Sequence, residues 1–131
     1  MYKIIQMKDN KGPVYPISNV YSTREQKIGI WIDGKPLYRK VIVFPDGLGG
    51  ATGEHGKTYS LRDFDINNVE EIFIGDPSFY TLSINRYPFA YYDGSYYDIY
   101  VNENYLGFRI TYDPIAKSRM VVTLEYTKTT D

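Results

Sequence analysis

Short segments in which apolar and polar residues alternate run through most of this chain, and turn-forming residues separate them. The last segment places four apolar residues on one face, and these are Met120, Val122, Leu124 and Tyr126. Successive side chains of a β-strand point to opposite faces, so a period of two is typical of strands. Helical spacing does not persist over any window of a dozen residues that is free of Gly and Pro. The chain therefore predicts an all-β protein.

Turn residues divide the chain into roughly eight to ten short strands, a spacing typical of a β-sandwich or barrel. The expected strands are Tyr2–Met7, Ile28–Ile32, Leu37–Phe44, Tyr59–Phe64, Val69–Ile74, Phe79–Ile84, Pro88–Tyr92, Tyr96–Val101, Leu106–Tyr112 and Met120–Thr127. Five glycines mark Pro45–Lys57 as a loop, and Asp113–Arg119 is expected to be a second one. We predict a single domain over 1–131, an antiparallel β-sandwich of jelly-roll-like form, in which 1–20 make an N-terminal hairpin or arm.

Composition narrows the classes of function. A chain of 131 residues fits one domain. Its net charge is −1 and no cluster of Lys and Arg is visible, so no nucleic-acid partner is expected. Cysteine is absent, which excludes disulfides and thiolate chemistry and fits assembly in a reducing cytoplasm. No apolar run approaches the length of a membrane span, and polar residues interrupt Met1–Asp9, so neither membrane insertion nor a signal peptide is expected.

Two passages carry a family likeness. The first, Tyr21–Lys40, reads YSTREQKIGIWIDGKPLYRK, and it closely resembles a segment of small domains in bacteriophage tail, receptor-binding and head-fibre proteins. The second, Val121–Asp131, ends in EYTKTTD and is similar to the terminus of those proteins. The opening Ile5–Asp9 also looks like the start of such proteins, whereas Ile30 stands where many of them carry Thr.

The resemblance implies a non-catalytic structural component of a virion, in a tail fibre or head fibre, with 21–131 as a fibre-type β module. It implies a homotrimer that contacts other virion proteins, is assembled in the host cytoplasm and contributes to attachment at the host surface. Five motif residues are expected to have structural roles, and these are Trp31, Asp33, Gly34, Pro36 and Tyr38. Asp-Gly suits a tight turn, and Trp31 is interpreted as an anchor in the core or at a subunit contact. The other reading of Trp31 is a platform on which a sugar stacks.

Tyrosine is unusually frequent, with 15 residues, nine of which lie from Tyr80 to Tyr112. Five of them are the candidate ligand-binding residues, namely Tyr91, Tyr92, Tyr96, Tyr97 and Tyr100. A tyrosine ring has a flat apolar face and a polar tip, which suits a subunit interface, a core or a sugar. The alternative function is therefore a carbohydrate-binding module that recognises host-surface polysaccharide through this region.

Other patterns give weaker signals. Gly56-Lys57-Thr58 matches the end of a phosphate-binding loop, but such a loop needs a helix after it and a strand is expected here. His55 is the only histidine, so a pair of histidine metal ligands is impossible. Asp63, Asp65 and Asn67 have the alternation of a calcium loop without its glycine. We expect no metal and no cofactor.

Glu70 and Glu71 are adjacent in an expected strand, so their side chains are expected on opposite faces, where they could not act as a carboxylate pair. No other combination of residues resembles an acid–base or nucleophile arrangement, and we expect no enzymatic activity.

Overall fold

The computed structural model describes residues 21–92 and 95–129, and for residues 90–92 and 95 it describes the backbone alone. Its nine strands are β1 (Gln26–Ile30), β2 (Pro36–Phe44), β3 (Lys57–Ser60), β4 (Val69–Leu82), β5 (Asn85–Pro88), β6 (Ala90–Tyr92), β7 (Ser95–Val101), β8 (Tyr105–Ile110) and β9 (Met120–Lys128). Two single turns complete the elements, the 3₁₀ helix η2 (Leu61–Phe64) and the helix α1 (Asp113–Ala116). Among the described residues, no helix is long and apolar enough to cross a bilayer.

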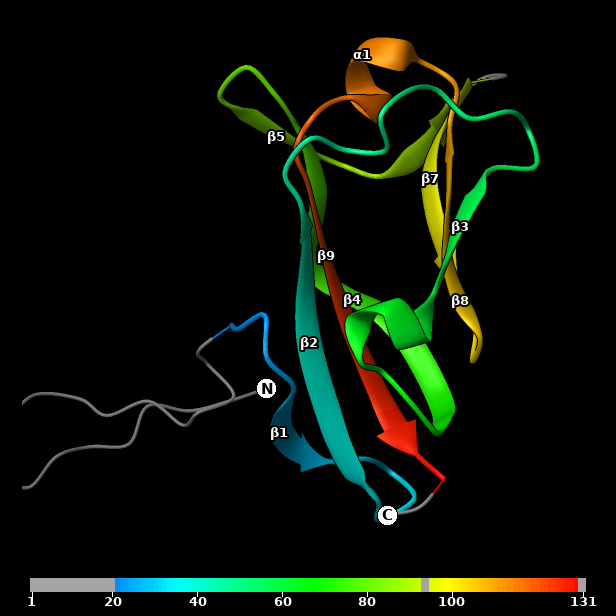
Figure 1. Ribbon diagram of the computed structural model, residues 1–131. Coiled ribbons are helices and arrows are strands. Elements are labelled where there is room, and N and C mark those ends of the chain that lie inside the picture. Colours follow the sequence, from blue (N-terminus) through cyan, green and yellow to red (C-terminus); the bar gives the residue numbers. More distant parts are fainter. Residues whose placement is uncertain (1–20, 93–94, 130–131) are drawn as a thin grey trace, which may run out of the picture.

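Two antiparallel sheets face each other (Figure 1). One has the strand order β1-β2-β9-β4-β5, and the other has the order β3-β8-β7-β6. This arrangement confirms the predicted all-β sandwich. β2 pairs with β9 in one sheet while β3 pairs with β8 in the other, and the chain crosses between the sheets four times, after β2, β3, β5 and β8. The strands between run as a β4–β5 hairpin and a β6–β7–β8 meander.

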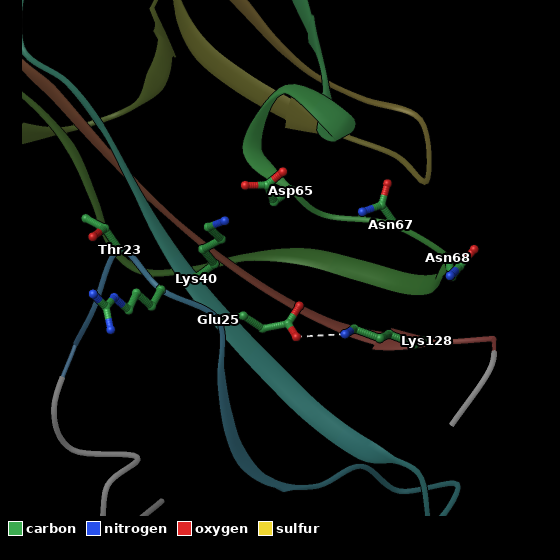
Figure 2. A pocket seen from close by; sticks show the side chains of 8 residues that line it. Thr23, Glu25, Lys40, Asp65, Asn67, Asn68 and Lys128 are labelled. Atoms are coloured by element: carbon green, nitrogen blue, oxygen red, sulfur yellow. Dashed lines mark hydrogen bonds and ion pairs between the residues drawn. The ribbon is translucent and has the colours of Figure 1, made fainter.

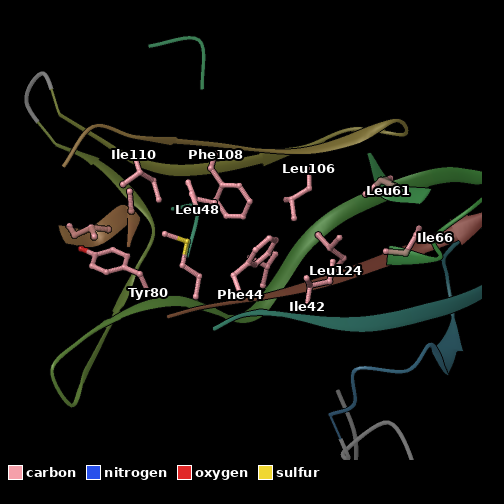
Figure 3. Packing of buried hydrophobic residues seen from close by; sticks show 14 of the residues in the cluster. Ile42, Phe44, Leu48, Leu61, Ile66, Tyr80, Leu106, Phe108, Ile110 and Leu124 are labelled. Atoms are coloured by element: carbon pink, nitrogen blue, oxygen red, sulfur yellow. The ribbon is translucent and has the colours of Figure 1, made fainter. Parts of the chain in front are cut away.

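The core lies between the sheets and is lined by the alternating residues of β8 and β9 (Figure 3). Seven of these side chains are 0% exposed, and they are Leu106, Phe108, Ile110, Met120, Val122, Leu124 and Tyr126. The Phe108 ring lies 5.2 Å from that of Phe44 and 5.9 Å from that of Tyr59, both in edge-on contact. Burying each such side chain contributes about 1.5–3 kcal/mol.

The glycine-rich loop between β2 and β3 is held against α1. Leu48 is buried, and its backbone N–H donates to the Ala116 carbonyl at 2.6 Å. Asp113 Oδ1 accepts the Ala51 N–H at 3.0 Å, and its other oxygen pairs with Lys117 at 2.8 Å. These contacts, the Lys117 bond first, lower the pKa of Asp113. The loop predicted from glycine content is therefore fixed by specific contacts.

The expected strand Tyr59–Phe64 was wrong from Leu61 onward. β3 ends at Ser60, whose Oγ accepts the Arg62 N–H at 3.3 Å and caps η2. Serine at that position competes with the strand for the backbone N–H groups that follow. The turn ends at Asp65, which adopts a left-handed conformation with φ 58°. Leu61 is nevertheless part of the core, where it is 2% exposed.

Further boundaries differ from the prediction, beginning with the strand expected over Ile28–Ile32, which is β1 and ends at Ile30. The segments Val69–Ile74 and Phe79–Ile84 were expected as two strands, but β4 runs through both as far as Leu82, with an irregularity between Gly75 and Phe79, and Ile84 lies in the turn that follows. The expected strand Pro88–Tyr92 splits at Phe89, where the chain passes from β5 in one sheet to β6 in the other. The expected loop Asp113–Arg119 contains α1, and the strand expected over Leu106–Tyr112 ends at Ile110. The predicted strand Tyr2–Met7 and the arm 1–20 lie outside the described residues.

The two isoleucines Ile110 and Ile84 give a matched test of this core, because they are 0% and 87% exposed. Ile110→Ala leaves a cavity beside Phe108 and should lower the free energy of unfolding by about 2–5 kcal/mol. Ile84→Ala removes the same atoms from a solvated turn and should change the free energy of unfolding by less than about 0.5 kcal/mol. Urea unfolding followed by circular dichroism measures both. Equal effects of the two substitutions would contradict the packing described here.

Candidate functional site

Strand β7 divides the candidate tyrosines between two faces. Tyr97 faces the core, with its ring 6.5 Å from that of Tyr80. Tyr96 and Tyr100 lie on the outer face of the sheet, as the alternation along β7 requires. Tyr91 pairs with Tyr96 through the backbone of β6, and Tyr92 pairs with Ser95. The side chains of Tyr91 and Tyr92 lie outside the description, so the structure brings together only Tyr96 and Tyr100.

Arg109 joins these two tyrosines. Its guanidinium carbon lies 4.9 Å from the ring centre of Tyr96 and 5.7 Å from that of Tyr100. Asp98, directly opposite on β7, accepts from Nη2 at 2.5 Å and from Nε at 3.3 Å. This two-pronged bond raises the pKa of Arg109 and fixes the plane of its guanidinium. The outer face of the second sheet therefore presents a rigid cation between two aromatic rings, a group we call the tyrosine face (Tyr96, Asp98, Tyr100 and Arg109).

Tyr100 owes its position to a glycine. It is paired with Gly107 on β8, and a Cβ at position 107 would lie 2.2 Å from two ring carbons of Tyr100. The ring therefore lies over the Gly107 backbone, with its hydroxyl donating to the His55 carbonyl at 3.3 Å. Tyr105 meets the same ring edge-on at 6.4 Å. Both strands and the glycine-rich loop thus hold this ring in place.

The motif residues form the turn between β1 and β2. The Trp31 N–H donates to the Lys35 carbonyl at 2.8 Å, and the Gly34 N–H donates to the Trp31 carbonyl at 2.9 Å. Gly34 has φ 88°, a conformation that favours glycine, and Asp33 Oδ1 accepts the Lys35 N–H at 3.0 Å. Pro36 then opens β2.

The side chain of Trp31 reaches β4 and is only partly buried. Its Nε1 donates to Glu71 Oε2 at 2.6 Å, and its ring lies 5.2 Å from that of Phe73 with a tilt of 33°. Tyr38 occupies the inner face instead, where it stacks on Tyr126 at 6.0 Å. Among the motif residues, Tyr38 therefore borders the core, while Trp31 connects the β1–β2 hairpin to β4.

Trp31 also lines a cleft of about 470 Å³, which we call the Trp31 cleft. Its walls are Trp31, Glu70, Glu71, Ile72, Phe73, Val101, Asn102 and Glu103. These residues come from the β1–β2 hairpin, from the start of β4 and from the β7–β8 turn. Sequence reasoning singled out Trp31 but missed the cleft, because nothing in the chain indicated that these three segments meet.

The expectation that Glu70 and Glu71 point to opposite faces fails here. Val69 pairs with Lys128 and Ile72 with Tyr126, so β4 has one residue more than β9 at this point. Such a bulge breaks the alternation of side chains. As a result, both carboxylates reach the same hairpin: Glu71 accepts from Trp31, and Glu70 pairs with Lys35 at 2.5 Å.

A second, polar cleft of about 570 Å³ opens beside the inner face of β2 (Figure 2). It is lined by Thr23, Arg24, Glu25, Lys40, Asp65, Asn67, Asn68 and Lys128. The Glu25 carboxylate accepts from Lys128 at 2.7 Å and from the Tyr126 hydroxyl at 2.5 Å. Lys40 donates to the Phe64 carbonyl. Much of the polar capacity of this cleft is therefore used in joining Glu25 to β9 and β2 to η2.

The weaker sequence patterns fall in strand β3 and at the end of η2. Lys57 begins strand β3, so the helix that a phosphate-binding loop needs does not follow it, and its Nζ donates to the Leu48 carbonyl at 3.0 Å. Asp63 and Asp65 flank the end of η2. Over residues 21–92 and 95–129, no group of three or more His, Cys, Asp or Glu side chains is placed to hold a metal ion.

Comparisons with protein-family models, with curated proteins and with solved structures found no match to this chain.

The contact between Tyr100 and Gly107 can be tested by substitution. Gly107→Ala should displace the Tyr100 ring and lower the free energy of unfolding by about 1–3 kcal/mol. Gly29→Ala is the matched control, because a Cβ there meets nothing within 4 Å. Adding Tyr100→Ala to Gly107→Ala should recover part of the loss. If the double variant is no more stable than Gly107→Ala, the ring does not lie where it is described.

Proposed function

We propose that this chain is a structural module of a bacteriophage virion, in a tail fibre or head fibre, that assembles with copies of itself into a homotrimer. The proposal also includes contacts with other virion proteins and a contribution to host attachment. It assigns the protein to the virion, with assembly in the host cytoplasm, and gives it no enzymatic activity.

One observation carries the proposal. Ile30 and Ile32 are 64% and 91% exposed, and both lie in the β1–β2 hairpin, the segment whose sequence resembles phage fibre domains. Exposing large branched side chains costs free energy, and neighbouring apolar residues on a surface are typical of interaction sites. An interface through this hairpin would explain why apolar residues stand at its tip.

The position of β1 supports the same interface. β1 is an edge strand, hydrogen-bonded to β2 on one side only within the described part of the chain. Open edges offer backbone N–H and carbonyl groups to another chain, and proteins usually protect them. Cyclic association of three copies would cover the same edge on every subunit, and threefold symmetry suits the axis of a fibre.

Light scattering over a dilution series tests the assembly. The wild-type chain should have three times the chain mass at micromolar concentration, and Ile32→Asp should weaken the assembly at least roughly tenfold by placing a charge in an apolar contact. Ile84→Asp is the control, because Ile84 is 87% exposed in a different hairpin. A wild-type chain that stays monomeric at micromolar concentration would refute the proposal, as would equal effects of the two substitutions.

A further inference from the structure

We infer that the Trp31 cleft is a binding site for saccharides that are neutral or carry an amino group. This inference goes beyond self-association and does not depend on it. It differs from the tyrosine-based alternative because its residues come from the β1–β2 hairpin, β4 and the β7–β8 turn.

The apolar wall of the cleft suits a sugar ring. Trp31 and Phe73 lie 5.2 Å apart, and Ile72 and Val101 extend the wall. The C–H face of a pyranose packs on the flat face of an indole, which is amphipathic in the same way as the sugar. The volume of about 470 Å³ lies in the range of small-molecule sites.

The polar rim offers the groups that sugar hydroxyls need. Glu71 uses Oε2 to accept the indole N–H, and its Oε1 has no hydrogen bond among the described residues. Asn102 Oδ1 accepts the N–H groups of Asn104 and Tyr105 at 2.8 and 2.9 Å, which fixes its amide and leaves the NH₂ group as a donor. Glu103 is exposed at the tip of the same turn. Carboxylate acceptors and an amide donor thus border an aromatic wall.

The aromatic platform is held in place before any ligand arrives. The Trp31 backbone is closed into the turn by its bonds with Lys35 and Gly34, and the indole is tied to Glu71. A side chain that is already ordered loses little entropy on binding, which increases affinity. Glu70 and Lys35 form an ion pair at 2.5 Å, so their charges compensate each other beside the cleft.

Charge selects the class of saccharide. Besides Glu70, which is paired with Lys35, the lining contains Glu71 and Glu103 and no Lys or Arg. Uronic acids and phosphorylated sugars would meet uncompensated carboxylates, and like charges in contact oppose binding. An ammonium group on an amino sugar would instead be attracted to the carboxylates and to the indole face.

Trp31 is the only tryptophan, so the fluorescence of the full chain reports on this cleft directly. A glycan array would first identify bound saccharides. Titration with the dimers of N-acetylglucosamine, glucosamine and galacturonic acid would then compare neutral, cationic and anionic probes. We expect array signals confined to neutral and amino saccharides, a change in Trp31 fluorescence with the first two dimers, and none with the third.

Charge reversal locates the site. Glu103→Arg should weaken saccharide binding at least tenfold while the melting temperature stays unchanged, because Glu103 is exposed in a turn. Glu54→Arg is the matched control, an exposed glutamate in the glycine-rich loop. An array without any signal, binding confined to acidic glycans, or binding that is indifferent to Glu103→Arg would each overturn the inference. Light scattering on the same samples measures self-association separately from saccharide binding. A monomer that binds saccharide would contradict the proposed trimer and support the saccharide site.

Discussion

The rest of the structure depends on strand β9, which is hydrogen-bonded to β2 on one side and to β4 on the other. Its inward side chains are fully buried, but so are Thr123 and Thr127 on the opposite face. A strand buried on both faces cannot shift by one residue without exposing apolar groups or burying unpaired polar ones. β9 therefore fixes the register of its whole sheet.

The two buried threonines also fix the position of β4 relative to β9. Thr123 Oγ1 donates to the Pro77 carbonyl at 2.6 Å, and its N–H donates to Ser78 Oγ at 3.0 Å, across one irregularity of β4. Thr127 Oγ1 accepts the Glu71 N–H at 3.3 Å at the other irregularity. Since that bulge turns Glu70 and Glu71 toward the β1–β2 hairpin, the geometry of the Trp31 cleft follows from the way β9 holds β4.

The two sheets carry different groups on their outer surfaces. The second sheet carries the tyrosine face, where Arg109 and Asp98 satisfy each other between two rings. The hairpin of the first sheet carries both the exposed Ile32 and the partly buried Trp31, which are adjacent in the chain. Self-association through Ile32 would therefore place the Trp31 clefts of neighbouring subunits near their interface, a suitable arrangement for binding a repeating polymer at several points.

The sequence by itself determined the fold class, because a period of two in segments such as 120–127 cannot be satisfied by a helix. It also determined the turn at Asp33-Gly34, where the chemistry is local. Only the tertiary structure decided that Leu61–Phe64 is a helical turn, that β4 continues past Gly75, and that the chain changes sheets at Phe89. It alone placed Trp31 against Glu71, 40 residues further along the chain. The alternation of apolar and polar residues predicts which side chains share a face of one strand. Which other segment packs against that face depends on contacts between residues far apart in the sequence, and a local pattern does not contain them.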